Sequence, residues 1–159
     1  MQTTAVIRPA TRRDIPALVA LWEELMEFHR QRDPFFTRAP DGGRIFARFV
    51  EENIRNESAC VLVAVVDSKI VGYCQGMLDR HPPALALSDF GQILDFGVTA
   101  EYRRAGIGQQ MFQALCEWFR REGMHRVEVR HSTCNEVGAQ FWPKMGFQPY
   151  LQTLFLELR

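Results

Sequence analysis

The chain has 159 residues, of which 47% are hydrophobic and 24% charged, a composition typical of globular proteins and not of disordered or fibrous ones. Its 19 basic residues balance 19 acidic ones, so no overall positive field favours nucleic acid or an acidic membrane surface as a partner. The length suits one hydrophobic core, and we expect residues 1–159 to form a single domain.

The N-terminal part of the chain predicts one strand followed by two helices. Asp14 is positioned to cap the first helix, and Pro16 fits its first turn. Apolar residues recur at helical spacing in both helices, and Pro34 ends the first one because proline disfavours helical geometry in the residue before it. The expected ranges are residues 4–10 for the strand, about 14–33 for the first helix and about 45–54 for the second.

The rest of the chain predicts five strands and two helices. Two β-branched runs flank Asp67-Ser68-Lys69, as in a β-hairpin, and Gly123 is a natural stop for the helix before it. The expected ranges are residues 59–78 for the hairpin, 92–98 for a strand, 107–121 for a helix, 125–132 for a strand, 135–147 for a short helix and 149–158 for a final strand. This order of elements predicts a mixed α/β domain.

Metal sites and membrane spans are not expected. The four cysteines form no CxxC pair, and the four histidines lack the spacing typical of metal ligands. The first residues contain no apolar leader, and no apolar run approaches the roughly 20 residues of a membrane span. These features predict a cytoplasmic protein that binds neither membrane nor nucleic acid.

Residues 99–112, TAEYRRAGIGQQMF, place two arginines and two glycines where the strand at 92–98 gives way to a helix. Glycine lets backbone approach a ligand closely, and the unpaired N–H groups of a helix's first turn attract an anion. Arg103 and Arg104 can donate charge-assisted hydrogen bonds to phosphate. We therefore predict a phosphate site here; the alternative is a glycine turn that serves only helix–strand packing.

Two common phosphate-binding motifs do not fit this turn. A dinucleotide fingerprint needs a third glycine where this chain has Met111. A Walker loop needs Gly-Lys-Ser/Thr, and Gly108 is followed by Gln109 and Gln110. Neither class of nucleotide-binding protein is therefore favoured.

The turn resembles the pyrophosphate loop of the GCN5-related N-acetyltransferases (GNAT), Arg/Gln-x-x-Gly-x-Gly/Ala, which residues 103–108 match position for position. Downstream, NEVGAQFWPKMGF is similar to the family's Asn-x-x-Ala-x-x-(Phe/Leu)-Tyr-x-x-x-Gly-Phe signature, with Asn135, Gly146 and Phe147 in register. The resemblance implies the GNAT fold, an α/β fold with a central mixed, mostly antiparallel sheet flanked by helices. Its fourth and fifth strands, here expected at residues 92–98 and 126–132, run parallel and splay apart.

The resemblance also implies where acetyl-CoA binds. The backbone of Phe96 and Val98 would pair with the pantetheine arm, and the amides from Arg104 to Gln109 would hold the pyrophosphate. Asn135 would bond to the pantetheine side; the alternative reading is a helix N-cap, and both can be true. The expected acetyl-CoA-binding residues are Phe96, Val98, Arg103, Arg104, Ala105, Gly106, Ile107, Gly108, Gln109 and Asn135.

The activity implied by the resemblance is transfer of the acetyl group of acetyl-CoA, without a metal, to a primary amine of a small molecule by direct attack. One alternative is a non-catalytic domain that binds or senses acyl-CoA. Another is acetylation of a protein N-terminus or lysine. The apolar–polar alternation of residues 152–158 also predicts a strand at a sheet edge, which would invite a homodimer.

The proton-transfer groups do not follow the family pattern. Trp142 stands where many relatives have a tyrosine acid, and an indole cannot give up its proton at neutral pH. Relatives often carry their catalytic base at the positions that Gln92 and Leu94 occupy here, and neither of these side chains is ionisable. Strand alternation puts both residues on the same face as Phe96.

Asp95 is the candidate catalytic residue, as a proton acceptor that acts directly or through water. Alternation puts it on the opposite face of the strand unless Gly97 marks a bulge. The alternative is a structural carboxylate paired with backbone or with an arginine.

Overall fold

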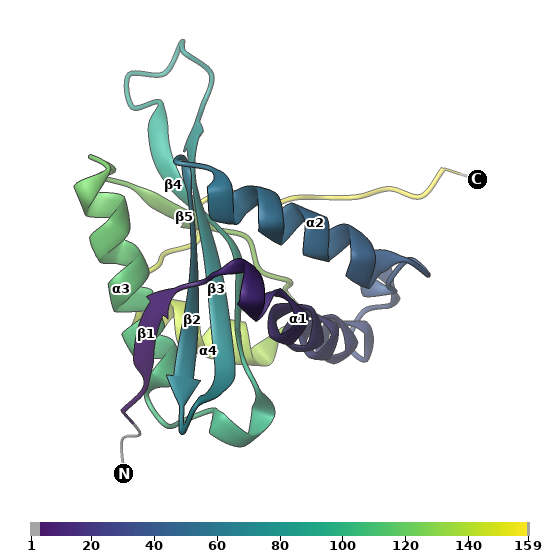
Figure 1. Cartoon of the computed structure of the whole chain (residues 1–159). Coiled ribbons are helices and arrows are strands. Elements are labelled where there is room, and N and C mark those ends of the chain that lie inside the picture. The colour runs from purple at the N-terminus through teal and green to yellow at the C-terminus, as the bar shows by residue number, and fades with distance from the viewer. Residues whose placement is uncertain (1–3, 159) are drawn as a thin grey trace.

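A computed structural model of the chain describes residues 4–158 and is built around one five-stranded sheet (Figure 1). The strands lie in the order β1-β2-β3-β4-β5; neighbours from β1 to β4 are antiparallel, and β5 runs parallel to β4. The strands are β1 (Val6–Pro9), β2 (Ala59–Val66), β3 (Lys69–Arg80), β4 (Asp89–Val98) and β5 (Val127–Val129). The helices are α1 (Ile15–Arg30), α2 (Gly42–Arg55), α3 (Ile107–Arg121) and α4 (Glu136–Lys144), with 3-10 turns η1 (Arg12–Asp14), η2 (Pro34–Phe36) and η3 (Ala100–Tyr102).

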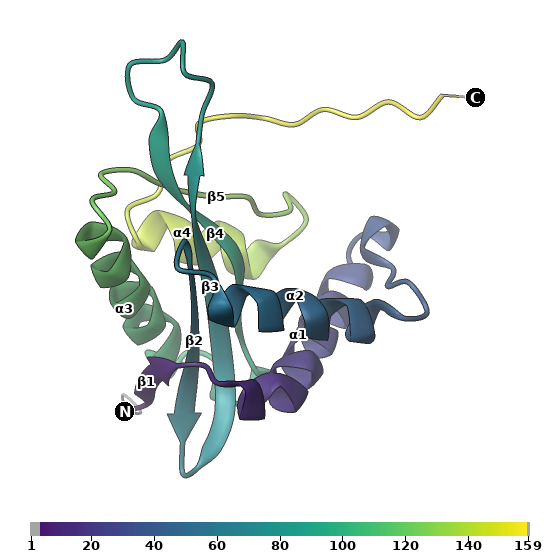
Figure 2. The ribbon, with the colours of Figure 1, turned by 45° about the horizontal axis from the view of Figure 1, so that its top comes forward.

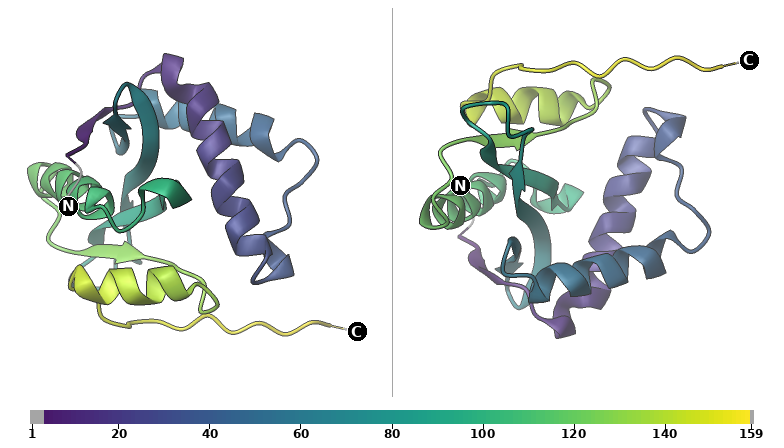
Figure 3. Two further views of the ribbon diagram at one scale, coloured as in Figure 1. Left: turned by 90° about the horizontal axis from the view of Figure 1, so that it is seen from below. Right: turned by 90° about the horizontal axis from the view of Figure 1, so that it is seen from above.

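The helices cover the two faces of the sheet. α1 and α2 pack on one face, and α3 packs on the other with α4 beside it (Figures 2 and 3). The core on the α3 side includes Leu62, Cys74, Ile93, Ile107, Met111, Leu115, Phe119 and Trp142. The core on the α1–α2 side includes Leu18, Phe46, Val50, Val61, Val63 and Tyr73. This arrangement confirms the mixed, mostly antiparallel sheet expected of a GNAT fold.

Glycines bring α3 close to the sheet. A Cβ at Gly91 of β4 would lie 2.4 Å from the Phe119 ring, and one at Gly76 of β3 would lie 2.8 Å from Leu115. Larger residues at these two positions would push α3 outward, so the glycines set its distance from β4. The N-terminus of α3 is thereby held close to the end of β4.

Asp14 precedes α1 as expected, but its side chain does not cap that helix. Its carboxylate instead accepts hydrogen bonds from the Arg8 guanidinium at 2.8 and 2.9 Å and from the Thr11 amide at 2.7 Å. The buried carboxylate therefore ties β1 to the start of η1, and the predicted capping role is wrong because a charged partner lies within reach.

Two strands expected in the C-terminal region differ from the structure: one is shorter than predicted and the other does not form in the described part of the chain. The strand expected at residues 125–132 is only Val127–Val129, where it has β4 as a neighbour. The strand expected at residues 149–158 is absent from the described part of the chain, where these residues are extended and project away from the sheet (Figure 1). Apolar alternation is present there, but no strand lies alongside to supply hydrogen bonds.

Candidate functional site

β4 and β5 separate after a short pairing. Residues Gly91–Ile93 pair with Val127–Val129, whereas residues 95–98 pair with β3 only. The C-terminal half of β4 therefore has one backbone edge that no other strand pairs with among residues 4–158. This edge lies at the end of β4 that leads toward the start of α3. The predicted parallel, splayed pair is confirmed.

A β-bulge at Leu94 decides which side chains share a face. Gln75 lies opposite Asp95 and Gly76 opposite Ile93, so Leu94 has no opposite residue on β3. Ile93 consequently faces the α3 side, whereas Asp95 faces the α1–α2 side. Asp95 therefore lies on the face opposite Phe96, as predicted, but the regular alternation fails across Leu94, which is the extra residue of the bulge instead of Gly97.

The glycine turn leaves a run of backbone donors unused. Arg104 and Gly106 have φ values of 61° and 83°, and Gly106 is the N-cap of α3, without a side-chain cap. The amide of Gln110 donates to the Gly106 carbonyl at 3.1 Å and begins the helical pattern. The amides from Arg104 to Gln109 have no hydrogen-bond partner among the described residues, so this turn offers N–H groups and a positive dipole end to an anion.

The two arginines of the turn have different surroundings. Nε of Arg103 donates to the Val98 carbonyl at 2.9 Å, and its guanidinium lies 4.9 Å from the centre of the Phe28 ring. Arg104 is exposed and forms no ion pair within the described part of the chain. Arg103 therefore fastens the turn to β4 and α1, and Arg104 is the cation that is open to an incoming anion.

Glu24 of α1 holds the start of the turn, although no pattern in the sequence indicates it. Its carboxylate accepts hydrogen bonds from the Thr99 hydroxyl at 2.8 Å and from the Ala100 amide at 2.9 Å. It lies far from this turn in the sequence, so only tertiary packing brings it there. α1 thus helps to position the glycine turn.

Gly108 also has a packing role. A Cβ at this position would lie 3.2 Å from the Phe141 ring and 3.7 Å from the Phe96 ring. The first turn of α3 therefore packs against aromatic rings of β4 and α4. The alternative interpretation of the turn, that its glycines serve helix–strand packing, therefore applies to Gly108.

Trp142 is buried, with 7% of its surface exposed. Its ring lies 5.3 Å from Phe96, 5.0 Å from Phe141 and 5.3 Å from Phe147, measured between ring centres. The residue at the usual tyrosine position is thus part of the aromatic core between β4, α3 and α4.

Asn135 is the N-cap of α4, and its side-chain oxygen accepts a 3.0 Å hydrogen bond from the Gly138 amide. The capping explanation is therefore confirmed. Its role in binding the pantetheine arm stays a prediction.

Asp95 ends a chain of buried amide side chains. Nδ2 of Asn53, on α2, donates to Oε1 of Gln75 at 2.9 Å, and Nε2 of Gln75 donates to Oδ2 of Asp95 at 2.8 Å. Gln75 is fully buried and Asn53 is 4% exposed. Burial raises the pKa of Asp95 to about 6, with the Gln75 hydrogen bond acting in the opposite direction. A carboxylate with this pKa can accept and release a proton near neutral pH.

Tyr73 lies on the same face of the sheet. Its hydroxyl is buried and has no hydrogen-bond partner within the described residues. Burial raises the pKa of Tyr73, and the charge of Asp95 raises it further. Tyr73 and Gln75 were not predicted from the sequence, because buried polar residues in a β-branched run look like any other strand positions.

Comparison with known proteins identifies the family. A model of the acetyltransferase (GNAT) family matches residues 17–147. The chain belongs to this family. The predicted resemblance is thereby confirmed, and the glycine turn, the unpaired edge of β4 and Asp95 all lie within the matched residues of this GNAT chain.

Curated relatives of the GNAT chain differ in the acceptor for which they are named. An N-alpha-acetyltransferase of Sulfurisphaera tokodaii is 29% identical over 63% of this chain and 63% of its own length. A putative [ribosomal protein bS18]-alanine N-acetyltransferase of Bacillus subtilis is 25% identical over 64% and 62%. A glucosamine 6-phosphate N-acetyltransferase of Trypanosoma brucei brucei is 34% identical over 43% and 44%. The match spans less than two thirds of each relative's length.

Solved structures share the fold over nearly the whole chain. The tetramutant of the BH1408 protein of Bacillus halodurans has a TM-score of 0.87 at 24% identity, covering 96% of this chain and 99% of that one. A predicted acetyltransferase of Clostridium acetobutylicum, solved with acetyl-CoA, has a TM-score of 0.79 at 19% identity, covering 97% of this chain and 96% of that one.

The helices in residues 4–158 lack the combination of length and apolar character that a bilayer span requires.

Proposed function

We propose that this GNAT chain transfers the acetyl group of acetyl-CoA to a primary amine of a small molecule. The observation that carries the proposal is the row of unused amides from Arg104 to Gln109 at the N-terminus of α3, directly beyond the unpaired edge of β4. The family match and the acetyl-CoA bound to the Clostridium acetobutylicum neighbour support the choice of donor.

The donor would bind along β4 and over the glycine turn. The pantetheine arm would take the place of a strand beside Phe96 and Val98, and the amides of the turn would hold the pyrophosphate. The exposed Arg104 would add a charge-assisted bond, while Arg103 would hold the turn in shape through the Val98 carbonyl. Asn135, at the N-terminus of α4, would contact the arm from the β5 side.

Asp95 would accept the proton of the incoming ammonium group, directly or through one water. The freed amine would then attack the thioester carbonyl and form the C–N bond. As the C–S bond breaks, the nitrogen would lose its second proton to solvent and leave a neutral amide. A pKa of about 6 leaves Asp95 ionised at pH 7, as a proton acceptor must be. Gln75 donates to Oδ2 of Asp95, and Oδ1 accepts no hydrogen bond from residues 4–158, so Oδ1 would be the oxygen that receives the proton.

The leaving thiolate would not need an acid at the usual tyrosine position. Trp142 is enclosed by the rings of Phe96, Phe141 and Phe147, and its indole does not lose a proton at neutral pH. We infer that CoA leaves as the thiolate and is protonated from solvent.

A second acceptor class is an N-terminal amine of a protein. One curated relative is named as an N-alpha-acetyltransferase and a second as a putative ribosomal-protein-alanine N-acetyltransferase, whereas the third is named for an amino-sugar phosphate. Aminoglycoside acetyltransferases are among the structural neighbours, including one of Acinetobacter baumannii with a TM-score of 0.78 at 14% identity.

The test is thiol release from acetyl-CoA with a panel of amines, together with calorimetric binding of acetyl-CoA. The panel holds aminoglycosides, amino-sugar phosphates and short peptides with free N-termini. Turnover on a small amine supports the proposal, and turnover on peptides alone supports the second class. Tight binding of acetyl-CoA without turnover on any amine would identify a non-catalytic acyl-CoA-binding domain.

A further inference from the structure

Two amide side chains lie where the packing of α2 on the sheet would ordinarily place apolar ones. Phe46, Val50 and Asn53 are the buried residues of α2, at helical spacing on the side that faces the sheet. Gln75 lies on β3 directly opposite Asp95 of β4. A buried amide destabilises the fold unless its polar atoms are paired. These two amides pair with each other and with Asp95, so their arrangement depends on that carboxylate.

The carboxylate of Asp95 fixes the direction of the hydrogen bonds. An ionised carboxylate can only accept hydrogen bonds, so Gln75 must turn its NH2 group toward Asp95. The side-chain oxygen of Gln75 then faces α2 and needs a donor, which the NH2 group of Asn53 supplies at 2.9 Å. Both hydrogen bonds therefore point from α2 toward β4 and stabilise the ionised form of Asp95.

Among the described residues, hydrogen bonds hold only one oxygen of Asp95. The 2.8 Å bond from the fully buried Gln75 goes to Oδ2 and anchors the carboxylate from its buried side. Oδ1 accepts no hydrogen bond from residues 4–158, and Asp95 itself is half-buried. Because Oδ2 is fixed, the carboxylate cannot turn freely and Oδ1 keeps one orientation.

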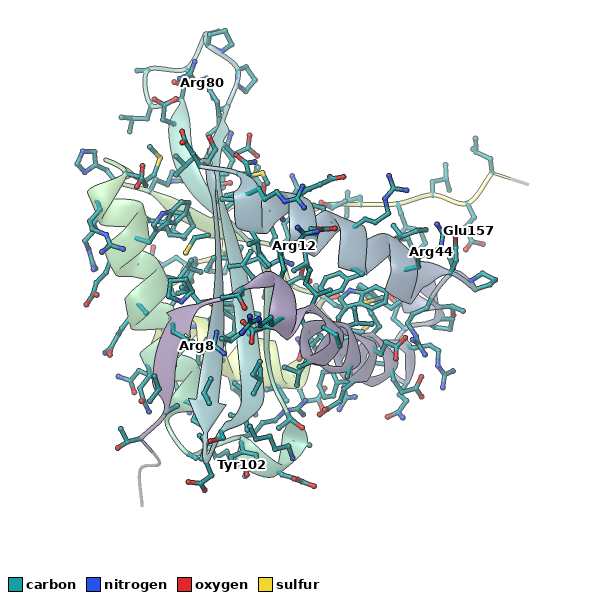
Figure 4. The ribbon with its side chains drawn as sticks, viewed as in Figure 1. Arg8, Arg12, Arg44, Arg80, Tyr102 and Glu157 are labelled. Carbon is teal, nitrogen blue, oxygen red and sulfur yellow. The ribbon has the colours of Figure 1, made fainter. Side chains whose placement is uncertain are left out.

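The groups around Asp95 include no second charged partner within the described residues. β3 also contributes Tyr73, whose pKa is raised by burial and by the charge of Asp95, and α1 packs the apolar Leu25 against the next turn of β4. Arg44 lies at the outer end of α2 and Arg80 at the projecting end of β3 (Figure 4). Burial therefore raises the pKa of Asp95, and the amide hydrogen bond is the influence that opposes it.

We propose that Gln75 and Asn53 are positioning residues of the acetyl transfer, which hold Oδ2 of Asp95 so that Oδ1 receives the proton of the acceptor ammonium. This role rests on the proposed function, in which Asp95 is the proton acceptor. The transfer breaks an N–H bond of the ammonium and forms an O–H bond at Oδ1, so Asp95 becomes neutral. The hydrogen bond from Gln75 is then no longer charge-assisted and weakens, which favours release of the proton to solvent before the next turnover.

The first experiment measures the pKa of Asp95 without any acceptor, by NMR titration of the carboxyl carbon in isotope-labelled aspartate. The resonance that is missing in Asp95→Asn identifies the residue. Gln75→Met keeps the length of the side chain and removes its hydrogen bonds, so the pKa of Asp95 should rise by about 1. Gln113→Met makes the same change on the exposed side of α3 and should leave that pKa unaltered. Equal pKa values in the parent and Gln75→Met would refute the proposal.

The second experiment measures kinetics on whichever amine of the panel is turned over: an aminoglycoside, an amino-sugar phosphate or a short peptide. In Gln75→Met, kcat should fall about tenfold even at a pH where Asp95 is fully ionised, because the carboxylate can turn, while KM for acetyl-CoA stays within about twofold. The acidic limb of kcat/KM should move to higher pH, as the NMR titration does. Asn53→Leu acts only through Gln75 and should shift both quantities in the same direction by less; parental values in this variant would exclude Asn53 from the role.

A further variant keeps the test valid if a single substitution prevents folding. Removing one amide leaves the other buried without a partner, so circular dichroism first checks each single variant. Asn53→Leu combined with Gln75→Met replaces both amides by apolar side chains of similar size, and it takes the place of a single variant that does not fold, with the same expected changes. An inactive parent would overturn the proposed function. An active parent whose variants keep its kcat and pH profile would overturn only the positioning role.

Discussion

Gln75 donates a 2.8 Å hydrogen bond to Asp95 across the β3–β4 pairing, beside the point where β4 loses its second neighbour. Asp95→Asn should lower kcat about 100-fold or more while acetyl-CoA affinity stays within about twofold, because a lost general base affects proton transfer and not donor binding. Steady-state kinetics on the amine found in the acceptor screen and calorimetry with acetyl-CoA measure the two effects.

The matched control for that variant is Asp89→Asn, which makes the same change on the same strand. Asp89 is exposed and pairs with Arg80 at 2.7 Å, away from the splayed half of β4. Its kcat should stay within about twofold of the parent's, because it removes only a surface ion pair. Equal losses in both variants would exclude Asp95 as the proton acceptor.

The pH dependence of kcat/KM should report the pKa of Asp95. The pKa is raised to about 6 by burial, so kcat/KM should fall about tenfold per pH unit below pH 6, where the carboxylate takes up a proton. The residual activity of Asp95→Asn should lack this acidic limb. A limb that survives in the variant would assign it to another group.

The same pKa shift means that the ionised Asp95 lowers the free energy of unfolding at neutral pH. Because the folded pKa lies above the ordinary value near 4, the folded state binds the proton more tightly, and stability falls as pH rises from about 4 to 6. Asp95→Asn should therefore raise the free energy of unfolding by about 2 kcal/mol at pH 7.5 and by much less at pH 4. Urea titrations at the two pH values test this; destabilisation at pH 7.5 would contradict it.

Gly106 and Gly123 sit at opposite ends of α3 with similar φ values, 83° and 79°. Alanine at either position should cost about 1 kcal/mol of stability, since both backbones are left-handed. Only Gly106→Ala should weaken acetyl-CoA binding, by about tenfold or more, because it alters the turn that offers the free amides. Calorimetry compares the two variants, and equal affinities would show that the turn does not hold the donor.

Asp14 should stabilise the fold with the opposite dependence on pH. The Arg8 hydrogen bond, together with that of Thr11, holds the pKa of Asp14 well below its usual range, against the effect of burial. Its contribution is therefore complete above about pH 4 and is lost as pH falls through the folded pKa. Asp14→Asn should cost about 2 kcal/mol at pH 7 in urea unfolding, while Asp41→Asn, at an exposed ion pair, should cost much less.

Arg32 and Glu136 join the end of α1 to the start of α4 through two hydrogen bonds of 2.8 and 2.5 Å. Glu136→Gln should loosen the connection between α1 and α2 and speed its cleavage by trypsin at Arg30, Arg32 and Arg38. Glu51→Gln breaks ion pairs with Arg12 and Arg55, which lie outside this connection, so cleavage should change less. Mass spectrometry of early digests gives the two rates, and equal rates would mean that α4 does not anchor this connection.

Short-range sequence patterns predicted the helices and turns that depend mainly on their own residues. The 3.6-residue period and Gly123 placed α3 at Ile107–Arg121, and Asp67 and Ser68 adopt the positive φ values of a hairpin turn. The glycine turn was also found from the sequence, because its chemistry is contained in a few consecutive residues. Period-two alternation failed at Leu94, since a bulge depends on how two strands pair and leaves no mark in one of them.

The sequence by itself determined the family, the order of the elements as far as α4 and the position of the glycine turn, because each rests on short-range spacing. Only the tertiary structure decided that Asp95 faces α2 and bonds to Gln75, that Trp142 belongs to the core, and that Glu24 holds the turn. It also left residues 149–158 without a neighbouring strand in the described part of the chain, although the alternation there predicts a strand. Contacts between distant residues depend on where the packed elements meet, and a strand exists only where another strand accepts its hydrogen bonds.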